Sequence, residues 1–295
     1  MFRSIRFYSL AGAWPDSEQA LSEALLRASF KPCGPLTERS SGWEPPAPQV
    51  PSLLSRRVGG ADLLRLRSQV RVLPTAAVNE ALEARIEEYR ARMQQEPGRR
   101  TKRQLKDQTR DELLPKALVR SERTLGLYVQ AERVIAVGSA SETRAERFLE
   151  QLRAALGKLE AKPLTFKRPV AELLTSVFTG DAQRDFVAGS ECRMRDPSER
   201  KSAVRWQDID LANATVRKCM KDGMQLTHLG IEFRNVMSAV VDANGVLTKV
   251  KLLGLDEPPQ SDSDDPLAQL DAELALVGGT LRQMLASMKQ ALDRG

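Results

Sequence analysis

Histidine, cysteine and aromatic residues are scarce in this chain of 295 residues, and each shortage excludes a class of chemistry. A single histidine, His228, cannot build a histidine-rich metal site, and a lone histidine is more often structural than a general base. Cys33, Cys192 and Cys219 lie far apart and form no Cys-x-x-Cys pair, so we expect neither a disulfide framework nor a zinc site. Aromatic residues make up 5%, which leaves little material for binding single strands by base stacking.

Long apolar runs and nucleotide-binding loops are also absent. No apolar stretch reaches the roughly 18 residues of a membrane span. The N-terminus resembles a signal peptide only faintly, because Arg6 and Ser9 interrupt its apolar stretch. No Walker loop, dinucleotide-binding glycine turn, zinc finger or basic zipper occurs. We therefore expect a cytoplasmic protein with no cofactor, no metal and no membrane partner.

Basic side chains, in contrast, are abundant and unevenly distributed. Residues 1–255 carry 42 Lys and Arg against 31 Asp and Glu, whereas residues 256–295 carry 3 against 8. The resulting net charges, +11 and −5, account for the +6 of the whole chain. A basic body with an acidic tail favours a polyanionic partner, and phosphate neutralisation gives affinity without sequence selectivity.

Residues 64–72 predict a strand with one apolar and one basic face. The apolar face consists of Leu64, Leu66, Val70 and Val72, and the basic face of Arg65, Arg67 and Arg71. Such a face is typical of an anion-binding surface or of an ordinary solvated sheet, and the alternation alone does not decide between them. Upstream we expect a strand over residues 2–10, a helix capped by Asp16, and a long ordered loop over residues 34–60.

A projecting helical hairpin is predicted next. Apolar spacing indicates helices over residues 76–94 and 101–114, separated by Pro97 and Gly98. The turn and the second helix carry a basic cluster, which consists of Arg99, Arg100, Lys102, Arg103 and Lys106. Lys116 and Arg120 follow soon after the second helix.

The rest of the chain predicts further short elements. Strands are expected at 125–129, 134–137, 203–206, 224–230, 232–241 and 246–253, and helices at 141–156 and 170–178. Asp242–Gly245 is a hairpin turn signal, and residues 256–266 read as an acidic linker.

The C-terminal helix repeats its apolar residues in a heptad-like pattern that includes Leu274, Leu281, Met284 and Met288. This seam either packs on its own domain or forms a dimer contact. Gly278 and Gly279 predict a kink or a close approach within it.

Two other functions stay open on the residues alone. Glu160-Ala161-Lys162 could place a metal ligand beside a lysine, as in a metal-dependent nuclease, although such a triplet arises easily by chance and no partner aspartate is evident. The acidic tail and the C-terminal seam could instead belong to a protein-interaction module that does not bind DNA.

Five stretches occur in an order and spacing that match a known family. They are Phe30-Lys31-Pro32-Cys33-Gly34 followed by Gly42-Trp43-Glu44-Pro45-Pro46, Val72-Leu73-Pro74 leading into residues 81–86, Leu113-Leu114-Pro115-Lys116-Ala117, Gly223 through Thr227 with Leu229, and Leu270 through Leu274. Together they resemble the RdgC family of bacterial recombination-associated proteins across nearly the whole chain.

The resemblance implies a multi-domain α+β chain with an inserted helical tip, which forms a ring-shaped homodimer around double-stranded DNA. Such proteins bind DNA with little sequence preference, restrain RecA-promoted strand exchange and associate with the nucleoid. Two contacts close the ring, one through the helical tip and one through a base domain. We expect a central domain over residues 1–75 plus 115–165, a tip hairpin over 76–114 and a base domain over 166–295.

The chain departs from its relatives at two positions. Leu118 stands where many relatives have an aromatic residue, and Asp208 brings a negative charge to the stretch that begins at Arg205. We predict DNA contacts from the basic face, the basic cluster and their neighbours: Arg65, Arg67, Arg71, Arg99, Arg100, Lys102, Arg103, Lys106, Lys116, Arg120 and Arg205. We predict dimer contacts from Leu118, Leu274, Leu281, Met284 and Met288, and no catalytic residue.

Overall fold

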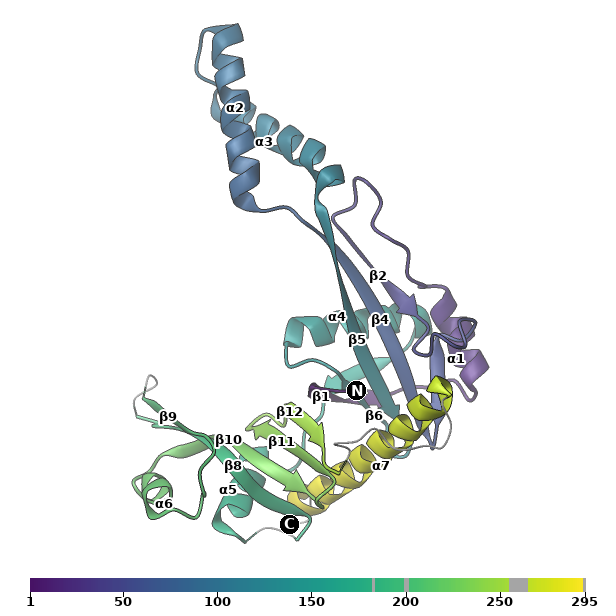
Figure 1. Cartoon of the computed structure of the whole chain (residues 1–295), viewed down its shortest axis with the longest axis vertical. Helices are drawn as coiled ribbons and strands as arrows, with labels where there is room; N and C mark the ends of the chain where they lie inside the picture. The colour runs from purple at the N-terminus through teal and green to yellow at the C-terminus, as the bar shows by residue number, and fades with distance from the viewer. Residues whose placement is uncertain (182–183, 199–201, 255–264, 294–295) are drawn as a thin grey trace. The chain divides into compact units, whose positions relative to one another are not determined.

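The computed structural model describes residues 1–181, 184–198, 202–254 and 265–293. The chain has a mixed α+β fold with antiparallel strands, and it separates into two compact units (Figure 1). The first unit comprises Met1–Arg27, Pro45–Arg65 and Thr124–Gly295, and the second comprises Ala28–Glu44 and Leu66–Arg123. This division does not coincide with the expected three-part organisation, which stays a prediction. No helix of the described residues is long and apolar enough to cross a membrane.

An antiparallel sheet forms the frame of the first unit. Its strands are β1 (Ser4–Ala11), β3 (Ser55–Val58), β6 (Val134–Val137), β7 (Glu160–Pro163), β8 (Phe186–Arg195), β9 (Ala203–Trp206), β10 (Gln225–Phe233), β11 (Met237–Asp242) and β12 (Leu247–Leu252), with parts of β4 (Ala61–Val72) and β5 (Leu118–Val129). Their order is β4-β5-β6-β1-β12-β11-β10-β8-β9, with β3 paired to β4 and β7 paired to β1. Its helices are α1 (Glu18–Leu26), α4 (Glu142–Leu156), α5 (Val170–Thr179), α6 (Ala214–Lys221) and α7 (Pro266–Asp293).

The apolar seam of α7 packs into the core of this unit. Leu274, Leu281 and Met284 have no exposed surface, and Met288 is 3% exposed, because they lie among residues of α5 and the β8–β12 strands. The heptad-like spacing therefore reflects packing on its own domain, and the expected dimer contact through these four side chains is corrected. Burial by the chain itself leaves them nothing to offer a partner.

A close approach between α7 and β4 explains the glycine at position 278. A Cβ at Gly278 would lie 3.0 Å from the Cβ of Ala61 on β4, whereas nothing lies close to Gly279. The close approach expected at this pair is confirmed, and α7 runs unbroken through it.

Several strand and turn predictions are confirmed, and others are wrong. Val134–Val137 and Ala203–Trp206 have the expected bounds, and the carboxylate of Asp242 accepts from the backbone N–H groups of Asn244 and Val246 in the hairpin turn. The preceding turn lies at Arg234 and Asn235, three residues later than expected, because both adopt positive φ angles of 48° and 55° that reverse the chain there.

The second unit combines a helical hairpin with strands. The hairpin consists of α2 (Thr75–Met93) and α3 (Arg99–Leu113), which lie side by side in Figure 1, and a 3₁₀ turn over Leu114–Lys116. The strands are β2 (Arg39–Glu44) and the remaining parts of β4 and β5. The expected loop over residues 34–60 is wrong, since β2 and β3 lie within it. Ser17, not Asp16, caps α1, because its hydroxyl accepts from Ala20 N–H at 3.1 Å.

Candidate nucleic-acid interface

One face of α3 carries a row of positive charge. Arg99, Arg103, Lys106 and Arg110 are spaced by four, three and four residues, so they share a face of the helix. All four are exposed, and so are Arg100 and Lys102. We call these six residues the α3 basic row. Thr109 is buried on another face, which fixes which side of the helix packs inward.

The N-terminus of α3 is electrostatically unfavourable for these cations. Gly98 caps it without a side-chain hydrogen bond, and its first turn has no acidic residue. Arg99 and Arg100 therefore lie at the positive end of the helix dipole, where each exposed cation costs about 0.3–1 kcal/mol. Helix stability does not account for arginines here, whereas a polyanionic partner does.

Most of the α3 basic row has no internal counter-ion. Lys102 lies 4.0 Å from Glu96 and Arg110 lies 2.6 Å from Glu38. Among the described residues no ion pair holds Arg99, Arg100, Arg103 or Lys106. These four side chains are available to phosphates without breaking an existing pair.

The segment that follows α3 continues the exposed basic surface. Lys116 ends the 3₁₀ turn and is exposed, and Arg120 on β5 is 66% exposed beside Glu122 at 3.2 Å. Leu118, between them, is 81% exposed. A large apolar side chain so open to solvent is compatible with its expected place in a dimer contact.

The arginines of β4 are less available than their alternation suggests. The guanidinium of Arg67 lies 4.5 Å above the ring of Phe30 and 3.7 Å from a carboxylate oxygen of Glu44. Arg65 and Arg67 are half-buried. On the other face, Val72 is 42% exposed, so the apolar side of the strand reaches solvent at its end.

The hydrogen-bond donors of Arg71 are engaged by backbone carbonyl groups. Its guanidinium donates to the carbonyl groups of Cys33, Gly34, Leu114, Pro115 and Ala117 at 3.2–3.4 Å. It thereby joins the loop before β2 to the turn that follows α3. The sequence could not show this use, because the acceptors are carbonyl groups of two segments distant in the chain.

Arg205 lies in the first unit, on β9. It is 52% exposed and donates to Glu191 on β8 at 2.8 Å. Asp208 is exposed close by and has a φ of 54°, a conformation that Asp adopts more readily than most residues.

The residues considered for catalysis do not assemble a recognisable centre. Glu160 and Lys162 lie on β7, are 74% and 78% exposed, and approach each other at 3.9 Å. In the described part of the chain no three His, Cys, Asp or Glu residues group as metal ligands. His228 lies on β10, where burial lowers its pKa, so it is neutral at pH 7.

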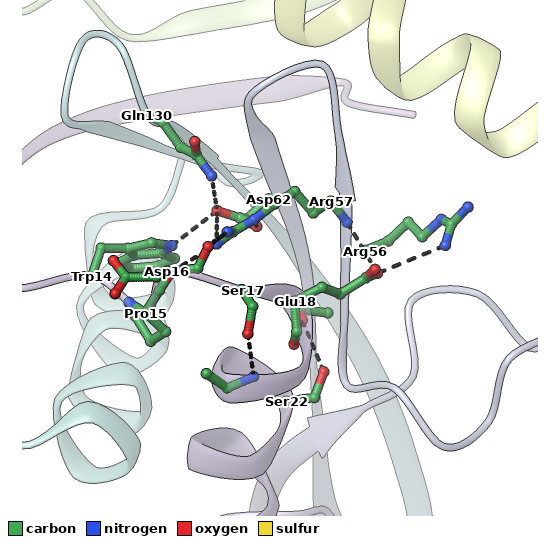
Figure 2. Close-up of polar contacts among 12 residues, drawn as sticks. Trp14, Pro15, Asp16, Ser17, Glu18, Ser22, Arg56, Arg57, Asp62 and Gln130 are labelled. Carbon is green, nitrogen blue, oxygen red and sulfur yellow. Dashed lines mark hydrogen bonds and ion pairs between the residues drawn. The ribbon is translucent and has the colours of Figure 1, made fainter.

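Asp62 is the buried carboxylate that the sequence did not reveal. It has no exposed surface, and Figure 2 shows its donors: Trp14 at 2.9 Å, Gln130 at 3.0 Å and Arg57 at 2.5 Å. Arg57 also donates to the carbonyl groups of Pro15 and Asp16. Both carboxylate oxygens of Asp62 accept from protein donors, and these hydrogen bonds hold the segment over residues 14–16 against β4.

Two further cations were missed by the sequence reasoning. Arg193 on β8 and Lys249 on β12 are both exposed. Buried Cys192 and Met194 alternate with exposed Arg193 and Arg195, a pattern that was readable as a half-buried strand.

Comparison with known proteins places the whole chain in one group. A family model described as "Putative exonuclease, RdgC" matches residues 1–294. The chain is similar to the recombination-associated protein RdgC of Xanthomonas campestris pv. campestris (strain B100), with 30% identity over 99% of this chain and 97% of the relative. It is also similar to the proteins of the same name from Stenotrophomonas maltophilia (30% identity, 98% and 97% coverage) and Pseudomonas fluorescens (29% identity, 99% and 96% coverage).

Proposed function

The chain belongs to the RdgC family of recombination-associated proteins, and from this membership we propose that it binds double-stranded DNA without reading its sequence and thereby modulates homologous recombination. The observation that carries the proposal is the α3 basic row. Four of its cations have no ion pair among the described residues, and two lie at a helix end where only an anionic partner would favour them.

The proposed mechanism is electrostatic occupancy of the duplex. Arginine and lysine neutralise backbone phosphates and release condensed counter-ions, which gives affinity that is independent of base sequence. Lys116 and Arg120 extend the surface, and Arg65 and Arg67 stay predicted contacts of smaller weight because they are half-buried. Arg71 would act through the fold, since its donors are engaged by carbonyl groups.

Assembly and biological role complete the proposal. A homodimeric ring would hold the duplex in a central hole, with Leu118 in one of the contacts that close it. Occupying the duplex would restrain RecA-promoted strand exchange, and the protein would be found in the cytoplasm, with the nucleoid.

A salt-dependent titration tests the proposal. Fluorescence anisotropy of a mixed-sequence duplex of about 30 base pairs should report tight binding that weakens steeply with salt and is weaker for single strands. Replacing one phosphate contact, as in Arg103→Gln, should reduce the slope of log affinity against log salt by about one unit.

Lys158→Gln is a matched control, because it removes one exposed cation at a position distant in sequence from the α3 basic row. Absence of duplex binding at moderate salt would refute the proposed function and favour the protein-interaction alternative. Charge reversal at Arg65 or Arg67 without loss of affinity would remove those two residues from the interface.

Exonuclease activity is the second candidate, because the description of the matching family model names it. The test is incubation of linear and supercoiled DNA with Mg²⁺ or Mn²⁺. Degradation that disappears in Glu160→Ala would assign the activity to the Glu160–Lys162 pair. If the DNA stays intact, nuclease activity is refuted and DNA binding remains the proposed function.

A further inference from the structure

A row of polar side chains crosses four strands of the first unit. Arg205 on β9 lies opposite Arg193 on β8, Arg193 opposite His228 on β10, and His228 opposite Asp242 on β11. Their neighbour Cys192 is fully buried, so the row occupies the other, outward face of the sheet.

The pairing of Arg193 with Arg205 is unfavourable by itself. Like charges directly opposite on neighbouring strands destabilise a sheet. No described carboxylate forms an ion pair with Arg193, and Asp242 is engaged by the amides of its turn. Burial lowers the pKa of His228, the nearby Asp242 raises it in part, and Arg193 and Arg205 lower it again. The imidazole therefore adds no charge at neutral pH, and the positive charge comes from arginine.

Glu191 holds the neighbouring cations together. One carboxylate oxygen accepts from Arg205 at 2.8 Å, and the other accepts from Lys249 on β12. Burial would raise the pKa of Glu191, but hydrogen bonds from Lys249 and Arg205 outweigh it and lower the pKa. In the amide orientation that satisfies both cations, the side-chain oxygen of Gln207 also accepts from Arg205 at 2.9 Å and Lys249 at 3.2 Å.

Lys249 reaches Glu191 over a long distance. Their strands are three positions apart in the sheet, which is about 14 Å in a flat sheet. Both side chains must therefore extend over the face, where Gly230 on the intervening β10 presents no side chain. Glu191 is only 17% exposed, whereas Arg205 and Lys249 are 52% and 50% exposed. The carboxylate of Glu191 is therefore mostly shielded from solvent, whereas Arg205 and Lys249 remain accessible to a ligand.

We propose that Arg193, Arg205 and Lys249 form a phosphate-binding site for the DNA backbone on this sheet face, and that Glu191 is its built-in competitor. The inference rests on the proposed duplex binding and deepens it. Arg205 and Lys249, which pair with Glu191, and Arg193, which lies opposite Arg205, leave a net charge of +2 at the site. A backbone phosphate is therefore attracted, while Glu191 offsets part of the repulsion among the cations in the free protein. Guanidinium groups suit phosphate because they donate two parallel hydrogen bonds.

Removing the competitor should strengthen binding. In the duplex titration, Glu191→Gln should raise affinity about threefold to fivefold, which is the size expected for releasing a surface ion pair. Arg193→Gln and Lys249→Gln should each weaken binding and reduce the salt slope by about one unit. Glu150→Gln and Lys158→Gln are the matched controls, since each makes the same charge change at an exposed position outside the strands that carry the site.

The outcomes separate the two proposals. If the unsubstituted protein binds duplex and Glu191→Gln, Arg193→Gln and Lys249→Gln all behave as their controls do, the site is wrong and the DNA-binding function stands. If the unsubstituted protein does not bind duplex, the proposed function is wrong. Calorimetric titration with tripolyphosphate then decides the site: tighter binding by Glu191→Gln supports a general anion site, and no heat from either protein overturns it.

Discussion

The role of a basic side chain in this protein depends on which groups it contacts. Arg103 and Arg71 belong to the same unit, yet one is exposed without an ion pair among the described residues and the other donates to five carbonyl groups. A guanidinium that satisfies several carbonyl groups ties segments together, and a lysine cannot reproduce its planar fork. The two arginines should therefore fail in different ways when they are replaced.

Arg71→Lys should destabilise the protein by about 1–3 kcal/mol, nearly as much as Arg71→Ala, although it keeps the charge. The reason is that most of the hydrogen bonds to the turn after α3 and to the loop before β2 are lost. Urea unfolding measures the change, and hydrogen exchange of the 114–117 amides locates it. A lysine variant as stable as the original protein would show that the charge alone matters; Arg103→Gln is the control and should change stability little.

At the scale of elements, α7 shows how one apolar pattern serves a core. Its inward residues contact α5 and the β8–β12 strands, and its close approach to β4 requires Gly278. Asp185, just before β8, links these segments by hydrogen bonds. Its carboxylate accepts from Arg234 after β10 at 2.9 Å and from Ser287 on α7 at 2.6 Å. The helix is thus held by burial along its length and by hydrogen bonds near its end.

Leu281→Ala should destabilise the protein by about 2–5 kcal/mol, because it removes a fully buried side chain and leaves a cavity. Leu276→Ala, at a position 37% exposed on the same helix, should cost much less. Denaturant melts at several protein concentrations measure both effects. If the loss at Leu281 varied with protein concentration, the side chain would contribute to a subunit contact instead.

Asp185 should make stability depend on acid pH. The hydrogen bond from Arg234 lowers its pKa most, and that from Ser287 adds to the effect, although burial opposes them. A carboxyl with a lowered folded-state pKa stabilises the fold above its unfolded pKa, and this contribution is lost as pH falls through the folded value. Below about pH 4 the original protein should therefore lose stability more steeply than Asp185→Asn in urea melts. Parallel pH profiles would show that Asp185 is not coupled to folding.

For the molecule as a whole, the proposed homodimer requires a surface through which two copies make contact. Leu274, Leu281, Met284 and Met288 of the α7 seam are buried in the core of their own unit, so this surface is not offered by them. Leu118 is the predicted contact residue that remains exposed. Assembly through it would also raise apparent DNA affinity, because two linked copies bind one duplex with avidity.

Leu118→Asp should shift the protein from dimer to monomer in sedimentation velocity and weaken duplex binding, since a charge cannot be buried unpaired in an apolar contact. Leu36→Asp is the control, because Leu36 is 73% exposed in the same unit. An unchanged dimer would place the contact elsewhere, and a monomeric original protein would refute the dimer itself.

The sequence by itself determined the features that depend on neighbours in the chain. The hairpin of α2 and α3 follows from apolar spacing and a Pro-Gly break, the β11–β12 turn follows from Asp242 through Gly245, and the α3 basic row is visible as a run of letters. These features need only periodicity, turn chemistry and composition. The family resemblance likewise rests on short motifs in order.

Only the tertiary structure decided which side chains are free. The apolar pattern of the α7 seam is the same for a core helix and for an interface helix, and only the sheet that covers it shows that it belongs to the core. Arg71 and Arg103 are equally basic in sequence, and distant carbonyl groups separate them. Arg193, Arg205, Lys249 and Glu191 converge because strand pairing brings three segments, β8, β9 and β12, onto one face. Burial and counter-ions are properties of long-range contacts, and no local pattern encodes them.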